Sequence, residues 1–318
     1  MTHAPKSVML LGATGTIGRA TAKALVAAGH TVTAPVRKGA DVSAMPFAVP
    51  TTLTQDALLS MMRAHACEAV ISCIASRSGV PQEARAIDHD LNSAALRAAL
   101  GAGVTQFVLL SAICVQKPKL AFQQAKLAFE AELQAAPLTW SIVRPTAFFK
   151  SLSGQLNRLQ DGKPFLLFGD GALTACKPIS NDDLGRYLVK CLADETLQNR
   201  ILPIGGPGPA ITPRAQGEML FQALGQPPRF KQVPVGLMSA IIAALATLGK
   251  VSSRLRDKAE LARIGRYYAT ESMLVWDAAA GRYDADATPE FGTETLADHY
   301  QRLARGDIAD DRGEHAVF

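Results

Sequence analysis

VMLLGATGTIGRATAKAL, from Val8 to Leu25, is the stretch that decides the fold. An apolar run ends at Gly12, two more glycines follow at Gly15 and Gly18, and helix-forming residues continue to about Ala28. This order predicts a strand, a tight turn and a helix. Glycines suit such a turn because the pyrophosphate of a dinucleotide must approach the backbone N–H groups at the start of the helix. The stretch therefore predicts a dinucleotide site, with a plain strand-to-helix turn as the alternative.

The composition is that of an ordinary enzyme-sized chain. Its 318 residues are 48% hydrophobic and 19% charged, which favours one large domain with an appended lobe. The net charge of +5 comes from charges scattered along the chain, so we expect no nucleic-acid partner. The five cysteines form no CxxC pair and no metal-ligand spacing, which favours reduced thiols and no metal site. Because MTHAPKS runs directly into the first predicted strand, we expect no signal or transit peptide and a cytoplasmic protein.

Predicted strands and helices alternate after the glycine stretch. Helices are expected over Thr54–Arg63 and Glu83–Ala102, with apolar runs between them that are typical of buried strands. The expected strands are His30–Lys38, Glu68–Ser76, Thr105–Ala112 and Leu138–Arg144. This alternation predicts an α/β fold: a doubly wound parallel-sheet Rossmann fold with a smaller C-terminal substrate lobe, and a ligand site at the carboxyl ends of the strands.

The end of the second predicted strand indicates which dinucleotide is bound. NAD-preferring sites usually place an acidic residue here for the ribose 2′-hydroxyl, whereas this chain has Arg37 and Lys38. Two cations suit a 2′-phosphate, and Arg19 on the glycine helix could reach the same group. NADPH is therefore the expected cofactor, and solvated loop cations are the alternative. We expect residues 1–160 to form the NADP-binding Rossmann domain, with further elements to about 205, and residues 161–318 to form mainly the substrate-binding lobe and C-terminal helices.

A lysine and a missing tyrosine follow the strand that ends at Ser111. Short-chain reductases with this layout carry a YxxxK pair on the next helix, because residues at i and i+4 share one face. The matching segment here is AFQQAK, in which Lys126 is present and the tyrosine is replaced by Phe122. A phenyl ring can neither donate a proton nor ionise, so the usual tyrosine acid/base step is absent. Lys126 is expected to hold the nicotinamide ribose and to donate a proton; a surface lysine is the alternative.

Beyond Pro145 the chain carries Phe148, Phe149 and Lys150, followed later by Lys177. Two phenylalanines beside a cation predict a wall for a flat apolar ligand with an acid group, although paired phenylalanines also occur in cores. The glycines of the FGDG segment, at residues 168–171, predict a turn between two short strands.

The most apolar segment is VPVGLMSAIIAALATLGK, residues 233–250. Its uncharged core, Pro234–Gly249, is too short to cross a bilayer, which needs about 20 residues. We expect a buried or pocket-lining helix because its polar face is poor for a surface-lying helix. An interfacial helix that meets a membrane is the alternative.

Five segments resemble the NADPH-dependent divinyl chlorophyllide 8-vinyl reductases, a family of the atypical, NmrA-like and isoflavone-reductase-like branch of the short-chain superfamily. They are SAICVQKP (111–118), FQQAKLAFEAEL (122–133), SIVRPTAFFKSLSGQ (141–155), FGDG with ACKPIS (168–180) and ARIGRYYATESMLVWD (262–277). The likeness runs from the glycine loop to at least Tyr283. It is carried most specifically by RPTAFFKSLSGQ and GRYYATESMLVWD. The missing tyrosine agrees with a branch that reduces C=C bonds. Plant members of the family carry a plastid transit peptide, so a chain expected to lack one resembles the bacterial members.

The resemblance implies an oxidoreductase of (bacterio)chlorophyll biosynthesis. The implied reaction is hydride transfer from NADPH to the 8-vinyl group of 3,8-divinyl chlorophyllide or protochlorophyllide, which becomes ethyl. The implied partner is this pigment, with transient association with a photosynthetic membrane surface as a further expectation. Two alternatives remain open: a non-catalytic NmrA-like NADP-sensing regulator, and an NADPH-dependent C=C reductase of another aromatic or quinone-like substrate. The sequence does not choose between the two pigments or indicate an oligomeric state.

The candidate site residues fall into three groups. The expected catalytic residue is Lys126, with Tyr267 or Tyr268 as rival proton donors. The expected cofactor-binding residues are Gly12, Thr14, Gly15, Thr16, Ile17, Gly18, Arg19, Arg37, Lys38, Ser76, Ser111, Lys126 and Pro145. The expected substrate-binding residues are Phe148, Phe149 and Met273 around the ring, and Lys150 or Lys177 at its carboxylate.

Overall fold

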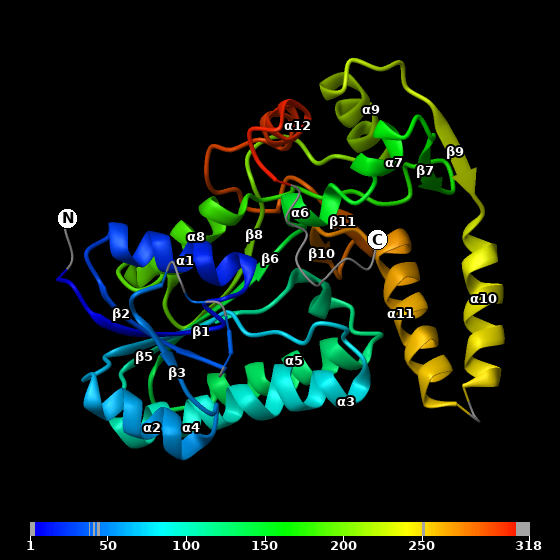
Figure 1. The fold of residues 1–318 in the computed structure, drawn as a ribbon. Coiled ribbons are helices and arrows are strands. Elements are labelled where there is room, and N and C mark those ends of the chain that lie inside the picture. Colours follow the sequence, from blue (N-terminus) through cyan, green and yellow to red (C-terminus); the bar gives the residue numbers. More distant parts are fainter. Residues whose placement is uncertain (1–3, 38, 41, 43–44, 250–251, 310–318) are drawn as a thin grey trace.

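The computed structural model describes residues 4–37, 39–40, 42, 45–249 and 252–309. A seven-stranded sheet with the order β3-β2-β1-β4-β5-β6-β8 forms its centre (Figure 1). The strands are β1 Ser7–Leu11, β2 Thr31–Val36, β3 Ala48–Pro50, β4 Ala69–Ser72, β5 Gln106–Leu110, β6 Thr139–Pro145 and β8 Arg200–Ile204, and every neighbouring pair is parallel. The strand order reverses between β1 and β4, which is where such sheets bind their ligands. The predicted doubly wound Rossmann fold is confirmed.

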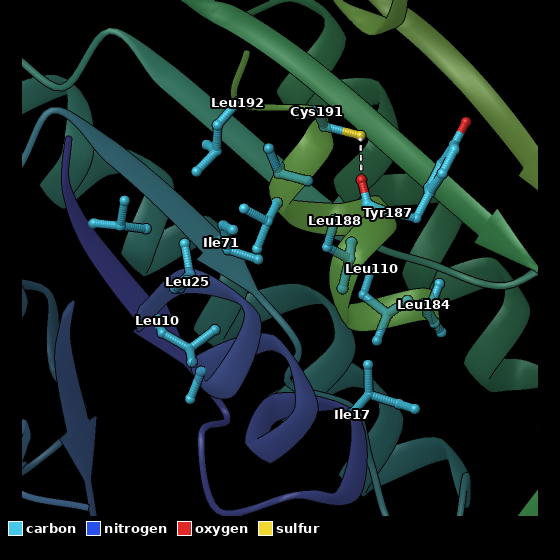
Figure 2. Packing of buried hydrophobic residues seen from close by; sticks show 14 of the residues in the cluster. Leu10, Ile17, Leu25, Ile71, Leu110, Leu184, Tyr187, Leu188, Cys191 and Leu192 are labelled. Carbon is cyan, nitrogen blue, oxygen red and sulfur yellow. Dashed lines mark hydrogen bonds between the residues drawn. The ribbon is translucent and has the colours of Figure 1, made fainter. Parts of the chain in front are cut away.

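Helices cover both faces of the sheet, which explains the continuous apolar runs of its strands. On one face lie α1 (Thr16–Ala27) and α8 (Asn181–Lys190), and on the other lie α2 (Gln55–Ala64), α4 (Asn92–Ala102) and α5 (Ala121–Gln134) (Figure 1). Alternate residues of β1 enter opposite cores. Val8 and Leu10 pack in the core beneath α1 and α8, part of which is drawn in Figure 2, whereas Met9 and Leu11 pack in the core beneath α2, α4 and α5.

The helix expected over Glu83–Ala102 is interrupted. The structure has α3 (Pro81–Ala84), a π-helical turn (Arg85–Leu91) and then α4. The side chain of Asn92 stabilises this turn: its Nδ2 donates to the Asp88 carbonyl at 3.2 Å, and its Oδ1 accepts from the Ser72 hydroxyl at 2.6 Å. The wider turn changes the direction in which buried Asp88 projects, and such turns recur at functional sites.

The remaining elements form a smaller lobe beyond the carboxyl ends of the strands (Figure 1). They are α6 Phe149–Leu152, α7 Leu156–Gln160, β7 Phe165–Phe168, α9 Pro213–Ala223, β9 Phe230–Val233, α10 Val235–Leu248, α11 Ser253–Thr270, β10 Val275–Asp277, β11 Arg282–Asp284 and α12 Leu296–Arg305. The turn expected at FGDG is confirmed, because Gly169 and Gly171 have φ values of 63° and 82°, but the second short strand expected after it is wrong. β7 pairs in parallel with distant β9, and the segment after the turn makes only isolated bridges, at Cys176 and Ile179.

Helix α10 is exposed, so the expectation of a buried helix is wrong, while a pocket-lining role stays a prediction. All of its residues are described, and none of them is buried. Leu237, Ile241 and Leu248 keep 51%, 47% and 53% of their surface exposed. The helix packs along α11 in a hairpin at the rim of the molecule (Figure 1). Within the described chain, no helix combines the length and apolar character needed to cross a membrane.

The contact between α1 and α8 can be tested at Gly185. A Cβ at this position would lie 2.7 Å from the carbonyl carbon of Ala20 and 2.8 Å from the amide nitrogen of Thr21. Because both neighbours are backbone atoms, Gly185→Ala must push the helices apart, and we expect a loss of about 1–3 kcal/mol in the free energy of unfolding by urea. The matched control is Gly236→Ala in α10, where nothing lies within 4 Å. Equal stability of the two variants would contradict the close-approach argument.

Candidate active site

The glycine loop fits a dinucleotide. Gly12 has a φ of 77°, and a Cβ there would lie 2.8 Å from the backbone of Cys73 at the end of β4. A Cβ on Gly18 would lie 2.0 Å from the Gly12 carbonyl oxygen. Gly15 is the N-cap of α1 and makes no side-chain capping bond, so the first-turn N–H groups are available to an anion. Thr14 and Thr16 border this cradle and are half-buried, whereas Ile17 packs in the core.

Two of the three expected 2′-phosphate cations are described. Arg19 on the first turn of α1 and Arg37 just beyond β2 are both exposed. Lys38 lies outside the described residues. Exposed guanidinium groups at this edge of the sheet are chemically suited to a 2′-phosphate, and their role stays a prediction.

Lys126 is held by a buried carboxylate that the sequence analysis did not include in the site. Its Nζ lies 2.9 Å from Oδ1 of Asp88, and the lysine and aspartate side chains are 11% and 0% exposed. The hydroxyl and backbone N–H of Ser76 donate to the same carboxylate at 2.5 and 3.3 Å. The fold therefore brings together two expected residues, Ser76 and Lys126, around Asp88. The available signal was that Asp88 and Asn92 stand one turn apart on the expected helix over Glu83–Ala102.

The phenyl ring of Phe122 is part of an apolar cluster. Phe122 is 8% exposed, and a Cβ added at Gly79 would contact both its ring and Ile264 of α11. The same cluster contains Tyr267 and Met273. Helix α11 of the smaller lobe therefore closes over the position of the absent tyrosine, and hydrophobic packing replaces acid/base chemistry there.

Ser111 and Pro145 lie at the ends of β5 and β6 and are buried. The Ser111 hydroxyl donates to Glu130 Oε1 at 2.5 Å, and Arg144 pairs with the same carboxylate. This network fixes α5 against the two strands, because an uncompensated buried charge is costly. Ser111 is thus bonded inside the protein, and its contact with a cofactor stays a prediction.

The hydroxyl groups of the adjacent tyrosines meet different atoms of Cys114. The Tyr267 hydroxyl lies 2.8 Å from the Cys114 carbonyl oxygen, to which it donates, and 3.1 Å from that of Lys117. Burial raises the pKa of Tyr267. Tyr268 packs edge-on to Tyr267, with ring centroids 5.7 Å apart, and its hydroxyl lies 3.8 Å from the Cys114 Sγ. Both hydroxyl groups therefore lie at the turn that precedes α5, while Tyr268 remains 37% exposed.

Two of the expected substrate residues are engaged within the protein. Phe149 is 2% exposed and packs against His299, with ring centroids 5.3 Å apart. Its ring belongs to the core of the smaller lobe, so packing within the protein explains a phenylalanine at this position without a ligand. Lys177 is 7% exposed, and its Nζ lies 2.5 Å from Glu290 Oε1. Glu290 therefore neutralises the Lys177 ammonium that was expected to bind the pigment carboxylate.

The other three expected substrate residues lie in different surroundings. Phe148 is half-buried against the core beneath α1 and α8. Met273 is 8% exposed and lies in the cluster around Phe122. The Nζ of Lys150 donates to Thr16 Oγ1 at 2.8 Å, which puts this cation at the glycine loop.

A second ionic cluster attaches the smaller lobe to the Rossmann part, and the sequence analysis missed it. Glu271, just after α11, accepts hydrogen bonds from Lys117, Lys119 and Tyr283. Lys117 Nζ also lies 4.0 Å from the ring centroid of Trp276. Burial opposes ionisation of Glu271, but the three hydrogen bonds outweigh it and lower its pKa to about 2. The cluster joins the β10–β11 hairpin to the segment before α5.

This chain is similar in sequence to an NAD(P)H-binding family and to plant reductases. A family model described as NAD(P)H-binding matches residues 12–195. Proteins named divinyl chlorophyllide a 8-vinyl-reductase from Oryza sativa and Zea mays are 45% and 44% identical to this chain, over 98% of it and 82% and 83% of their own lengths. The relative with the same name from Arabidopsis thaliana is 41% identical over 95% of this chain and 78% of its own length.

Solved structures resemble the fold. An NADPH-dependent quinone oxidoreductase of Escherichia coli, complexed with NADPH, has a TM-score of 0.68 at 17% identity and covers 93% of this chain and 99% of its own. A leucoanthocyanidin reductase from Vitis vinifera has a TM-score of 0.68 at 14% identity, with coverages of 94% and 99%. At these identities the likeness concerns the architecture, including the smaller lobe.

The Glu271 cluster predicts a specific acid sensitivity. Its folded-state pKa of about 2 lies below the ordinary 4.5, so its stabilisation is present above about pH 4.5 and is lost as the pH falls toward 2. We expect Glu271→Gln to lower the free energy of unfolding by about 2–3 kcal/mol at neutral pH and to match the unmodified protein near pH 2. Urea unfolding at several pH values measures this. A deficit that stays constant with pH would refute the assignment.

Proposed function

The chain belongs to the family of divinyl chlorophyllide a 8-vinyl-reductases, and we propose that its site reduces the 8-vinyl group of 3,8-divinyl chlorophyllide to an ethyl group with NADPH. NADPH, when bound, supplies the hydride. The observation that carries the proposal beyond the family is that Lys126 and its buried partner Asp88 lie beside Phe122, where alcohol-reducing relatives keep their tyrosine acid. A vinyl group conjugated to a macrocycle needs less acid catalysis than a ketone, because the ring delocalises the negative charge left by hydride addition.

We propose Lys126 as the anchor of the nicotinamide ribose and as the donor of the proton that completes the ethyl group. An ammonium has several N–H donors, so Lys126 can keep its bond to Asp88 while another N–H meets the ribose or the substrate. Burial of Asp88 supports this role, since a fixed carboxylate holds the lysine in one position. Tyr268 is the rival donor, whereas the carbonyl partners of Tyr267 support a structural role for that residue.

The pigment itself is proposed to lie between the two parts of the molecule. Residues 1–160, with elements to about 205, would bind NADPH, and residues 161–318 would supply most of the pigment surface. Phe148, Met273 and the exposed ring of Tyr268 are the apolar groups proposed to contact the macrocycle. Arg19 and Arg37 are proposed to meet the 2′-phosphate of NADPH.

Substitution separates the two candidate donors. We expect Lys126→Met to lower kcat about 100-fold or more, since general acid catalysis contributes about 10²–10⁴. Tyr268→Phe should keep kcat within a few-fold. Tyr267→Phe should do the same and should lower the free energy of unfolding by about 1 kcal/mol, the contribution of its hydrogen bond. The measurement is the blue shift of the Soret band when protein, NADPH and divinyl chlorophyllide are mixed. Normal turnover in Lys126→Met together with lost turnover in Tyr268→Phe would reverse the assignment.

We also propose a cytoplasmic protein that attaches to the surface of a photosynthetic membrane through α10. Leu237, Ile241 and Leu248 are four and seven residues apart and therefore share one face of the helix. Exposed cations flank the hairpin at Lys231 before α10 and at residues 254, 256 and 258 of α11. An uncharged apolar helix between cations is suited to an anionic lipid surface, where the apolar side chains enter the interface.

Vesicle binding tests the attachment. We expect the full chain to co-sediment with phosphatidylglycerol vesicles and to bind phosphatidylcholine vesicles more weakly. Replacing Leu237, Ile241 and Leu248 together by Gln should weaken binding at least about tenfold, because each buried apolar side chain contributes about 1–3 kcal/mol. The matched control replaces three exposed apolar residues elsewhere, Val26, Leu173 and Ile201, by Gln. Equal loss in both triple variants would contradict a specific role for α10.

A further inference from the structure

We propose that Lys150 is a ligand of the cofactor pyrophosphate and not of the pigment carboxylate. Its ammonium donates to the hydroxyl of Thr16 at 2.8 Å. Thr16 is the first residue of α1 and directly follows the Gly15 N-cap. The cation therefore lies at the point where the glycines leave room for a dinucleotide phosphate.

Helix electrostatics supports an anion at this position. The N-terminus of α1 carries the positive end of the helix dipole, which favours anions and disfavours a neighbouring ammonium. Asp and Glu are absent from the first turn of α1, so no acidic side chain of that turn offsets the positive end of the helix dipole. A phosphate between the first-turn N–H groups and Lys150 would replace this repulsion by attraction, because the helix N-terminus and the ammonium would then each face a negative charge.

The backbone that carries Lys150 lies where the Rossmann part passes into the smaller lobe. Its neighbour Phe149 begins α6 and is buried in the core of the smaller lobe, whereas its N–H donates at 3.3 Å to the carbonyl of Ile179, which packs in the core beneath α1 and α8. Thr16 is the first residue of α1, which covers the Rossmann sheet. A pyrophosphate bound by both would join the glycine loop to the lobe that provides most of the pigment surface. Lys150 would therefore make the position of that lobe depend on the bound cofactor.

Cofactor titration without pigment tests this assignment independently of the reductase reaction. We expect Lys150→Met to raise the Kd of NADPH about 10- to 100-fold, measured by nicotinamide fluorescence, since it removes a charge-assisted hydrogen bond. Lys150→Arg, which retains the charge, should recover most of the affinity. The control is Lys23→Met on α1, the helix that Thr16 begins, which removes an equal charge from an exposed pair with Asp182 and should leave the Kd within about twofold.

Two further measurements separate the pyrophosphate from other acid groups. NADPH and NADH share the pyrophosphate, so Lys150→Met should weaken both by the same factor. A loss confined to NADPH would assign Lys150 to the 2′-phosphate and overturn the proposal. An unchanged Kd for both cofactors with a raised KM for the pigment would return Lys150 to the substrate carboxylate. Near-ultraviolet circular dichroism of each variant checks that the fold is retained, and Lys150→Gln, which also removes the charge, provides the test if Lys150→Met unfolds.

Discussion

Close backbone–backbone contact at the glycines of the β1–α1 turn is the constraint on which the active site depends. Gly12 lies against the end of β4, and Gly18 lies against the Gly12 carbonyl, at distances that exclude any Cβ. These contacts set the start of α1 and thereby the direction of its free N–H groups. They also hold the turn at the place where the strand order reverses between β1 and β4. The position proposed for the cofactor thus follows from steric exclusion at two glycines.

Buried charge organises the rest of the site. Asp88 holds Lys126 and Ser76 on one side of α5, and Glu130, one turn further along α5, holds Ser111 and Arg144. Each carboxylate is compensated by a cation and a hydroxyl, as burial requires. Helix α5 is therefore fixed in rotation, and Lys126 is directed to one location. The π-helical turn contributes by carrying Asp88 inward.

The smaller lobe is attached at two levels that serve different purposes. Apolar packing of Ile264 and Tyr267 against Phe122 closes the site, and the Glu271 cluster fixes the adjoining hairpin from outside. Helix α10 takes no part in this closure and leaves its apolar face in solvent. A flat apolar pigment partitions into membranes. An exposed apolar helix would therefore let the enzyme bind at the membrane surface where such a substrate is located.

Local pattern was sufficient for the Rossmann sheet, because glycine spacing and apolar runs are properties of short segments. The replacement of tyrosine by Phe122 and the presence of Lys126 were likewise readable from spacing on one helix. Contacts between distant segments were not. Asp88 with Lys126, Lys150 with Thr16, and β7 with β9 join residues 38, 134 and about 65 positions apart, and such pairs depend on how whole layers pack. The hydropathy of α10 likewise predicted apolar surface but not its exposure. Sequence determined the cofactor fold and the type of chemistry, whereas tertiary structure decided which charges meet and which apolar face stays open, because burial and pairing are properties of the packed chain.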